Sequence, residues 1–211
     1  MVPPARVTIS VMGSGSDEFD DVAKPLGKLL VNLQVNLPTG AGGGVMTSVS
    51  RAFTGSPRER GICIGIVPCA DVDRRDKAKD GYPNRYVELP IFTHLPYSGE
   101  LGQHDLSRNH INILSSMAVI GLPGGPGTAS EVELAVRYQK PILAFSPNEA
   151  LVSAFHPGVR RARQIGEVEA FLKGVLARVR DERALAEAGR GVRQCRRRQL
   201  LHYGCRREVV R

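Results

Sequence analysis

The chain has 211 residues, of which 42% are hydrophobic and 24% charged, and its formal net charge is +8. This length suits one sizeable α/β domain and is short for two. We expect a cytoplasmic protein, because no apolar run approaches the roughly 18 residues that a membrane span needs and the N-terminus lacks the pattern of a secretory signal peptide.

Apolar strands alternate with helices along the chain. Strands are predicted over residues 6–12, 35–38, 61–68, 87–95, 117–122 and 141–145. Helices are predicted over residues 19–34, 45–53, 101–116, 128–138 and 167–179. The segment 69–86 is polar and predicts an irregular loop. Because the strands are apolar on both faces, the alternation predicts an α/β fold with a doubly wound, Rossmann-like parallel sheet and an added C-terminal helix.

The basic residues are concentrated toward the C-terminus. Residues 151–211 hold 15 Lys and Arg against 6 Asp and Glu, which gives +9, whereas the first 150 residues hold 14 against 15. We therefore expect one Rossmann-like nucleotide-binding domain over residues 1–185 and a basic tail over residues 186–211. A basic tail can bind nucleic acid or anionic lipid. No series of aromatic residues accompanies these arginines, so a solvated tail is the favoured interpretation and neither a nucleic acid nor a membrane is expected as a partner.

The four cysteines indicate neither a metal site nor a disulfide framework. Cys63 lies in the apolar run of residues 61–67, which is typical of a small buried thiol. Cys63 and Cys69 are six residues apart, and Cys195 and Cys205 are ten apart. Neither pair has the CxxC spacing of zinc ligands, so no metal is expected.

Three strand ends carry glycine-rich turns, at residues 13–16, 40–44 and 124–127. In doubly wound folds ligands lie beyond the carboxyl ends of the strands. Glycine allows close backbone approach, so that N–H groups can converge on an anion at the start of a helix. The turns match neither the dinucleotide fingerprint nor a Walker A loop. They favour a ligand of mononucleotide size that carries a phosphate.

Thr128 and Glu131, which follow the third turn, have two possible roles. A Thr-x-x-Glu pattern at the start of a helix is a capping box, in which each side chain binds the backbone N–H of the other residue. Alternatively, Glu131 lies in the first turn beside the group that the phosphate carries, where a carboxylate can act in catalysis. The residues alone leave both alternatives open.

The sequence PGGPGTASE, from Pro123 to Glu131, resembles the PGGxGTxxE motif of the Lonely Guy family, which is often mislabelled as lysine decarboxylase. That family has an arginine fifteen residues before the first proline of the motif, and here Arg108 stands fifteen residues before Pro123. The turns VMGSGS and TGAGGGVM resemble two further glycine turns of the family. Asn109 follows Arg108, where members of the family commonly have lysine.

The resemblance implies a phosphoribohydrolase that splits a nucleoside 5′-monophosphate, such as AMP or an N6-modified adenine nucleotide, into free base and ribose 5-phosphate. It implies that Arg108 and Glu131 are the catalytic residues, that no cofactor takes part, and that the protein is at least a homodimer. It also implies a set of residues that hold the phosphate or nucleotide: Gly13, Ser14, Gly42, Gly43, Gly124, Gly125, Gly127 and Thr128.

The segment from Ser107 to Gly125 also resembles a sister group of the same fold, which includes molybdenum-cofactor carriers. These proteins bind a pterin cofactor without hydrolysing it. A carrier or nucleotide-binding protein without turnover is therefore the alternative to the enzyme.

Overall fold

The structure, a computed structural model, describes residues 6–57 and 59–204, with side chains described as far as residue 186. Two groups of strands are present. Four strands pair in the order β1 (Ile9–Met12), β5 (Ala118–Gly121), β6 (Ile142–Phe145) and β7 (Arg160–Ala162). Three further strands pair in the order β2 (Leu37–Thr39), β3 (Cys63–Val67) and β4 (Leu89–Phe92). Every pair is parallel.

The two groups are joined between β1 and β2 by a parallel bridge from Thr8 to Asn36. The N–H of Ile9 donates to the carbonyl of Asn36 at 3.0 Å, and the N–H of Asn36 donates to the carbonyl of Val7 at 2.8 Å. The strand order is therefore β4-β3-β2-β1-β5-β6-β7. The order reverses at β1, because the chain moves outward through β4 and returns to β5 beside β1. This reversal confirms the doubly wound α/β fold and places the switch point, where such folds bind ligands, between β1 and β5.

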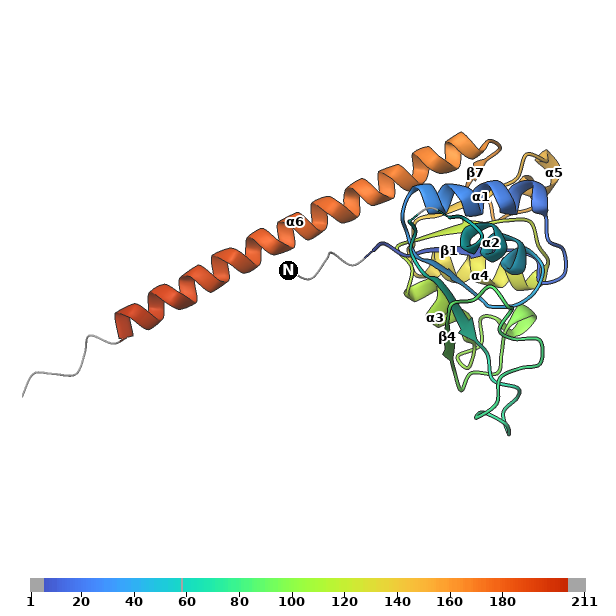
Figure 1. The fold of residues 1–211 in the computed structure, drawn as a ribbon, viewed down its shortest axis with the longest axis horizontal. Helices are drawn as coiled ribbons and strands as arrows, with labels where there is room; N and C mark the ends of the chain where they lie inside the picture. Colours follow the sequence, from blue (N-terminus) through green and yellow to red (C-terminus); the bar gives the residue numbers. More distant parts are fainter. Residues whose placement is uncertain (1–5, 58, 205–211) are drawn as a thin grey trace, which may run out of the picture. The chain divides into compact units, whose positions relative to one another are not determined.

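The described residues form six α-helices (Figure 1). They are α1 (Asp20–Asn32), α2 (Val45–Thr54), α3 (Asn109–Leu114), α4 (Pro126–Arg137), α5 (Glu149–Ser153) and α6 (Ile165–Gly204). In α2, Val45, Val49 and Phe53 recur at every fourth position and are buried, which makes one apolar stripe. Right-handed crossovers on opposite sides of the switch point place α1 and α2 on one face of the sheet and α4 on the other.

Most of the predicted elements are confirmed, but the helix predicted over residues 101–116 is wrong in its first half. Only a 3-10 turn at Gly99–Leu101 and the short α3 form there. The N–H of Tyr97 donates to the carbonyl of Leu106 at 3.3 Å, and the N–H of Arg108 donates to the carbonyl of Tyr97 at 3.3 Å. These long-range backbone bonds replace the helical ones, so α3 begins just after Arg108.

Two elements that follow β6 in the chain, α5 and β7, are not predicted from the sequence. The strand β7 pairs with β6 through the register of Leu143 with Arg160 and Phe145 with Ala162. It is short and two of its three residues are arginines that lie exposed, so it lacks the apolar run by which a buried strand is recognised.

The chain divides into two units, Met1–Leu172 and Lys173–Arg211. The first holds the sheet and the helices α1 to α5, and the second holds most of α6. The boundary expected after residue 185 falls inside α6. Of the basic tail, residues 205–211 and the side chains from residue 187 onward lie outside the described part of the chain. Within that part, no helix combines the length and the apolarity needed to cross a membrane.

Candidate functional site at the switch point

A cavity of about 400 Å³ lies beyond the carboxyl ends of β1 and β5, at the start of α4. We call it the Arg108 cavity. Seven of the residues singled out in the sequence line it: Gly13, Ser14, Arg108, Gly125, Gly127, Thr128 and Glu131. The three segments that carry them are far apart in sequence, and the sheet brings them together because β1 and β5 are neighbours. The cavity therefore occupies the place at which doubly wound sheets bind ligands.

The start of α4 differs from the capping box considered above, and that interpretation is wrong. The N-cap residue is Gly125, Pro126 is the first helical residue, and no side chain caps the helix. Thr128 and Glu131 consequently lie in the third and sixth helical positions, too far along for the reciprocal capping bonds. Glu131 is buried and does not cap the helix.

The first turn of α4 presents positive charge to the cavity. The N–H groups of Thr128 and Ala129 donate to the carbonyl of Gly125 at 3.0 and 3.1 Å, and Pro126 has no N–H. Gly127 and Thr128 of this turn line the cavity, and they carry a backbone N–H and a hydroxyl that can donate to a ligand. Together with the helix dipole they suit a phosphate or another anion.

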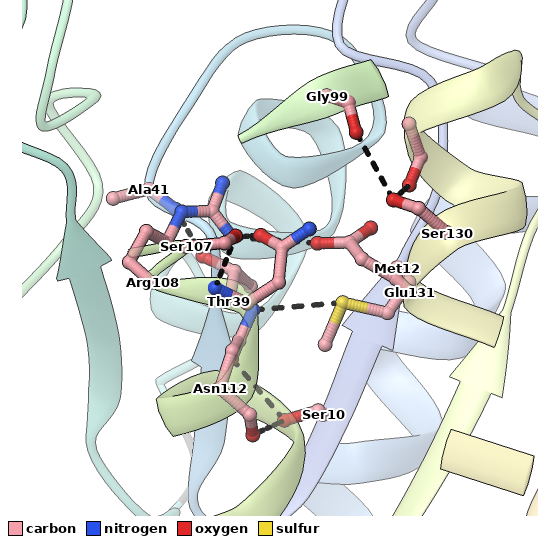
Figure 2. Close-up of polar contacts among 12 residues, drawn as sticks. Ser10, Met12, Thr39, Ala41, Gly99, Ser107, Arg108, Asn112, Ser130 and Glu131 are labelled. Carbon is pink, nitrogen blue, oxygen red and sulfur yellow. Dashed lines mark hydrogen bonds and ion pairs between the residues drawn. The ribbon is translucent and has the colours of Figure 1, made fainter. Parts of the chain in front are cut away.

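Glu131 and Arg108 form a buried ion pair on the wall of the cavity (Figure 2). Nη1 of Arg108 donates to Oε1 of Glu131 at 3.3 Å, and the two side chains are only 4% and 10% exposed. Burial raises the pKa of Glu131 above its ordinary value, because the loss of hydration outweighs the attraction of the nearby Arg108. The carboxyl group of Glu131 therefore holds its proton to a higher pH than an exposed glutamate does.

Arg108 is held in place by its neighbours but keeps an unused donor. Nη1 of Arg108 also donates to Oδ1 of Asn109 at 2.7 Å. Within the described residues, Nε of Arg108 and Nδ2 of Asn109 have no hydrogen-bond partner although both are buried. A buried polar atom without a partner is costly, and a ligand in the cavity can satisfy the guanidinium of Arg108.

The helix α3, which follows Arg108, is held to the strand β1 by hydrogen bonds of buried side chains (Figure 2). The hydroxyl of Ser10 donates to the carbonyl of Asn112 at 3.3 Å and also bonds the hydroxyl of Ser116. Nδ2 of Asn112 donates to the sulfur of Met12 at 3.5 Å. All four of these side chains are buried, so the position of Arg108 is tied to the central strand of the sheet.

Close backbone packing keeps the glycine turns together. The N–H of Ser14 donates to the carbonyl of Pro123 at 3.0 Å, and the N–H of Val45 donates to the carbonyl of Ser14 at 2.9 Å. A Cβ added to Gly124 would lie 2.0 Å from the hydroxyl of Thr128 and 2.7 Å from the N of Ser14. Only glycine fits at position 124, because any larger residue would push the first and third turns apart.

Three of the glycines assigned to the nucleotide do not line the Arg108 cavity. A Cβ on Gly42 would approach the hydroxyl of Tyr82 at 2.8 Å, and one on Gly43 would approach the carbonyl of Gly15 at 2.8 Å. These two glycines pack behind residues that do line the cavity. Gly124 lines a neighbouring cavity instead.

Gly15 and Ser16, the rest of the first glycine turn, also line the cavity, together with residues that the sequence did not reveal: Met46, Lys79, Tyr82, Ser98 and Gly99. Lys79 and Tyr82 come from the irregular segment between β3 and β4. That segment has no periodic pattern, so its residues could be placed at the cavity only by the tertiary fold. Lys79 adds a cation and Tyr82 an aromatic ring to the side of the cavity that the loop forms.

The two described cysteines, Cys63 and Cys69, are both free and buried, and burial raises the pKa of the Cys63 thiol to about 11. Among the residues whose side chains are described, no three His, Cys, Asp or Glu gather as metal ligands would. The groups at the site are cations, hydroxyls and backbone N–H groups around one carboxyl, a set that suits a phosphorylated ligand.

Residues 6–171 match the model of the SLOG cluster4 family. The chain is similar to the molybdenum cofactor binding protein from the phototrophic bacterium Rippkaea orientalis, with 28% identity, a TM-score of 0.60, and 82% of this chain and 99% of that chain covered. It is also similar to the molybdenum cofactor carrier protein from Chlamydomonas reinhardtii, with 27% identity, a TM-score of 0.57 and the same two coverages. An uncharacterised protein of Archaeoglobus fulgidus is 27% identical over 141 residues, which are 66% of this chain and 80% of that protein.

Proposed function

The chain belongs to the SLOG cluster4 family, and on that premise we propose that it hydrolyses the N-glycosidic bond of a nucleoside 5′-monophosphate such as AMP. The family match supports membership of the wider SLOG group, and membership of the narrower group of Lonely Guy enzymes is part of the proposal. One observation carries it. A buried Arg108–Glu131 pair stands on the wall of a cavity whose adjoining wall is the start of α4.

The phosphate binds at the first turn of α4, against the N–H of Gly127 and the hydroxyl of Thr128. Thr128 and Glu131 are three residues apart on this helix, so their side chains are neighbours on one face. A ribose attached to the phosphate therefore lies beside Glu131, and the base extends toward Tyr82 and Lys79 on the loop.

In the reaction the bond between C1′ and the base nitrogen breaks, and the bonding electrons leave with the base, which takes up a proton. The oxygen of a water molecule then bonds to C1′ and loses a proton, which gives ribose 5-phosphate. Positive charge develops on the ribose as the base departs. Ionised Glu131 stabilises that charge in a site with little water, or orients a ribose hydroxyl or the attacking water. Arg108 supplies fixed donors to the phosphate, a hydroxyl or the base.

A second candidate function is carriage of the molybdenum cofactor without turnover. The observation in its favour is that two proteins described as binding or carrying this cofactor are 28% and 27% identical to this chain over 82% of its length. The cofactor is a pterin that bears a phosphate, and the Arg108 cavity offers the same anion-binding turn to it. In a carrier, Arg108 and Glu131 would bind the cofactor and would take no part in a reaction.

Incubation with AMP and with isopentenyl-AMP, followed by chromatography of the products, separates the two functions. The enzyme releases free base and ribose 5-phosphate, and the release is lost in Arg108→Ala and Glu131→Gln. Arg137→Ala is the matched control, because Arg137 is exposed on the same helix α4 and does not line the cavity. Tight binding of the pterin cofactor together with intact AMP would support the carrier and contradict the enzyme.

The resemblance to the enzyme family also implies an oligomeric state and a cellular environment. We propose a homodimer or a larger homo-oligomer that acts in the cytoplasm on a small phosphorylated ligand. Sedimentation of the purified protein tests the first of these points.

A further inference from the structure

A second cavity lies on the other side of the start of α4, toward α5. It has a volume of about 240 Å³, and we call it the α5 cavity. Its wall is largely apolar and includes Val132 of α4 together with Leu151, Ala154 and Phe155 from α5 and the residues after it. Two ionisable residues, Glu133 and His156, also line it. Nothing in the proposed hydrolysis of a nucleoside monophosphate uses this space.

The two cavities meet at the anion-binding turn. Gly125 and Thr128 line both the Arg108 cavity and the α5 cavity. A Cβ added to Gly125 would have no protein atom within 4 Å outside its chain neighbours, so the space beside this residue is open. An anion held at Gly125–Thr128 is therefore bordered by a polar cavity on one side and by an apolar cavity on the other.

The chemistry of the two walls defines the ligand that fits both. A phosphate monoester has one organic substituent and fills only the Arg108 cavity. A ligand in which phosphate groups link two organic groups can place one in each cavity. The apolar lining of Val132, Leu151 and Phe155 suits a flat aromatic group, which gains free energy from burial and from ring contacts. On the other side, Arg108 and Lys79 line the Arg108 cavity and make its wall polar and cationic.

We propose that the α5 cavity binds the second nucleoside of a pyrophosphate-linked dinucleotide, whose phosphates bind at Gly125–Thr128 and whose first nucleoside occupies the Arg108 cavity. The inference rests on the proposed function, since it takes from it the position of the phosphate. It widens the ligand class from nucleoside monophosphates to dinucleotides.

Calorimetric titration with AMP, ADP and diadenosine diphosphate tests the proposal. Diadenosine diphosphate, in which a pyrophosphate joins two adenosines, is expected to bind about tenfold more tightly than AMP or ADP, a difference of about 1.4 kcal/mol. ADP shows whether added negative charge alone accounts for the gain. Chromatography after each titration measures how much nucleotide the protein has hydrolysed, and where base is released the titration is repeated with Glu131→Gln.

Two variants and one control separate the cavities. Ala154→Trp fills the α5 cavity from an exposed position, and Leu151→Ala removes part of its apolar wall. Both should abolish or reduce the advantage of diadenosine diphosphate and leave AMP affinity within about twofold. Ala150→Trp places the same ring on the same helix outside the cavity and should change neither affinity.

The outcomes distinguish this inference from the proposed function. If AMP binds but diadenosine diphosphate binds no more tightly, the inference is overturned and the proposed function stands. An advantage that persists in Ala154→Trp and Leu151→Ala also overturns it, because the second nucleoside must then lie elsewhere. If neither nucleotide binds the wild-type protein, the phosphate site itself is refuted and both proposals fall.

Discussion

The guanidinium of Arg108 occupies the space that a side chain at Gly40 would fill. A Cβ added to Gly40 would lie 2.2 Å from Nη2 of Arg108. This distance is far shorter than a van der Waals contact. Gly40 directly follows β2, and Arg108 directly precedes α3. The second glycine turn thus serves the site by leaving room for the arginine, although Gly42 and Gly43 in the same turn do not line the cavity.

Gly40→Ala should therefore displace Arg108 and reduce turnover of AMP. Arg108 cannot simply swing aside, because it is buried and bonded to Glu131 and Asn109. Misplacement of a catalytic group by about 1 Å can cost about 100-fold in rate, and we expect a loss of about 10-fold to 100-fold in kcat. Gly166→Ala is the control, since its Cβ would meet no atom within 4 Å. Equal turnover in the two variants would show that the position of Arg108 is unimportant.

Glu131→Gln should abolish most of the activity while leaving the fold intact. Glutamine keeps the size of the side chain and can still bond Arg108, but it has no negative charge to offer to the ribose cation. We expect a loss of about 100-fold or more in kcat, retained affinity for AMP, and a melting temperature near that of the wild type. Wild-type turnover in this variant would remove Glu131 from the mechanism.

The raised pKa of Glu131 predicts a distinct pH dependence of stability. The unfolded chain has the ordinary pKa of 4.5 at this residue, and burial raises it in the folded protein. At a pH between the unfolded-state and folded-state pKa values, the folded protein binds more protons than the unfolded chain. The contribution of Glu131 to the free energy of unfolding therefore falls as the pH rises through this range. Glu131→Gln lacks this titration.

The measurement is the free energy of unfolding of both proteins in urea, from about pH 4 to about pH 8. Relative to Glu131→Gln, the wild type should lose stability as the pH rises. A difference that stays constant, or that changes in the opposite direction, would mean that Arg108 compensates fully for the buried charge.

Gly125→Val should weaken the binding of AMP far more than the binding of adenosine. The backbone at Gly125 has φ −94° and ψ −155°, an extended conformation that valine adopts readily. Its side chain would meet no protein atom within 4 Å at Cβ, so it takes up only space that belongs to the anion. Melting curves should confirm that the variant folds normally. Equal losses of AMP and adenosine affinity would place the phosphate elsewhere.

The positions of most strands along the chain could be predicted because each central strand is a continuous apolar run, as in Ala118–Gly121, and glycine or polar turns separate the runs. The strand β7 could not be predicted, because two of its three residues are exposed arginines and it has no apolar run. The helix after Leu101 was overpredicted because its local sequence permits a helix, whereas backbone bonds to Tyr97 oppose it. Local sequence carries no information about such long-range bonds.

The candidate site was predicted to the extent that it rests on strand ends and on the start of one helix. Arg108, Glu131 and the turn at Gly125–Thr128 do meet at one cavity. The exact start of α4 could not be predicted, since Thr128 is as good a cap by type as Gly125. The contributions of Lys79 and Tyr82 depend on how a long irregular segment folds back over the sheet, which no periodic pattern reports.

The two sides of the Arg108 cavity differ in how freely they can change during evolution. Arg108 and the turn at Gly124 are fixed by close contacts, because one methyl group added at Gly40 or Gly124 would clash. The segment that carries Lys79 and Tyr82 lies between two strands and has only turns and an isolated bridge, so substitutions and changes of length there disturb few buried contacts. Substitutions in residues 68–88 can therefore change which ligand the cavity binds, while the phosphate turn stays the same.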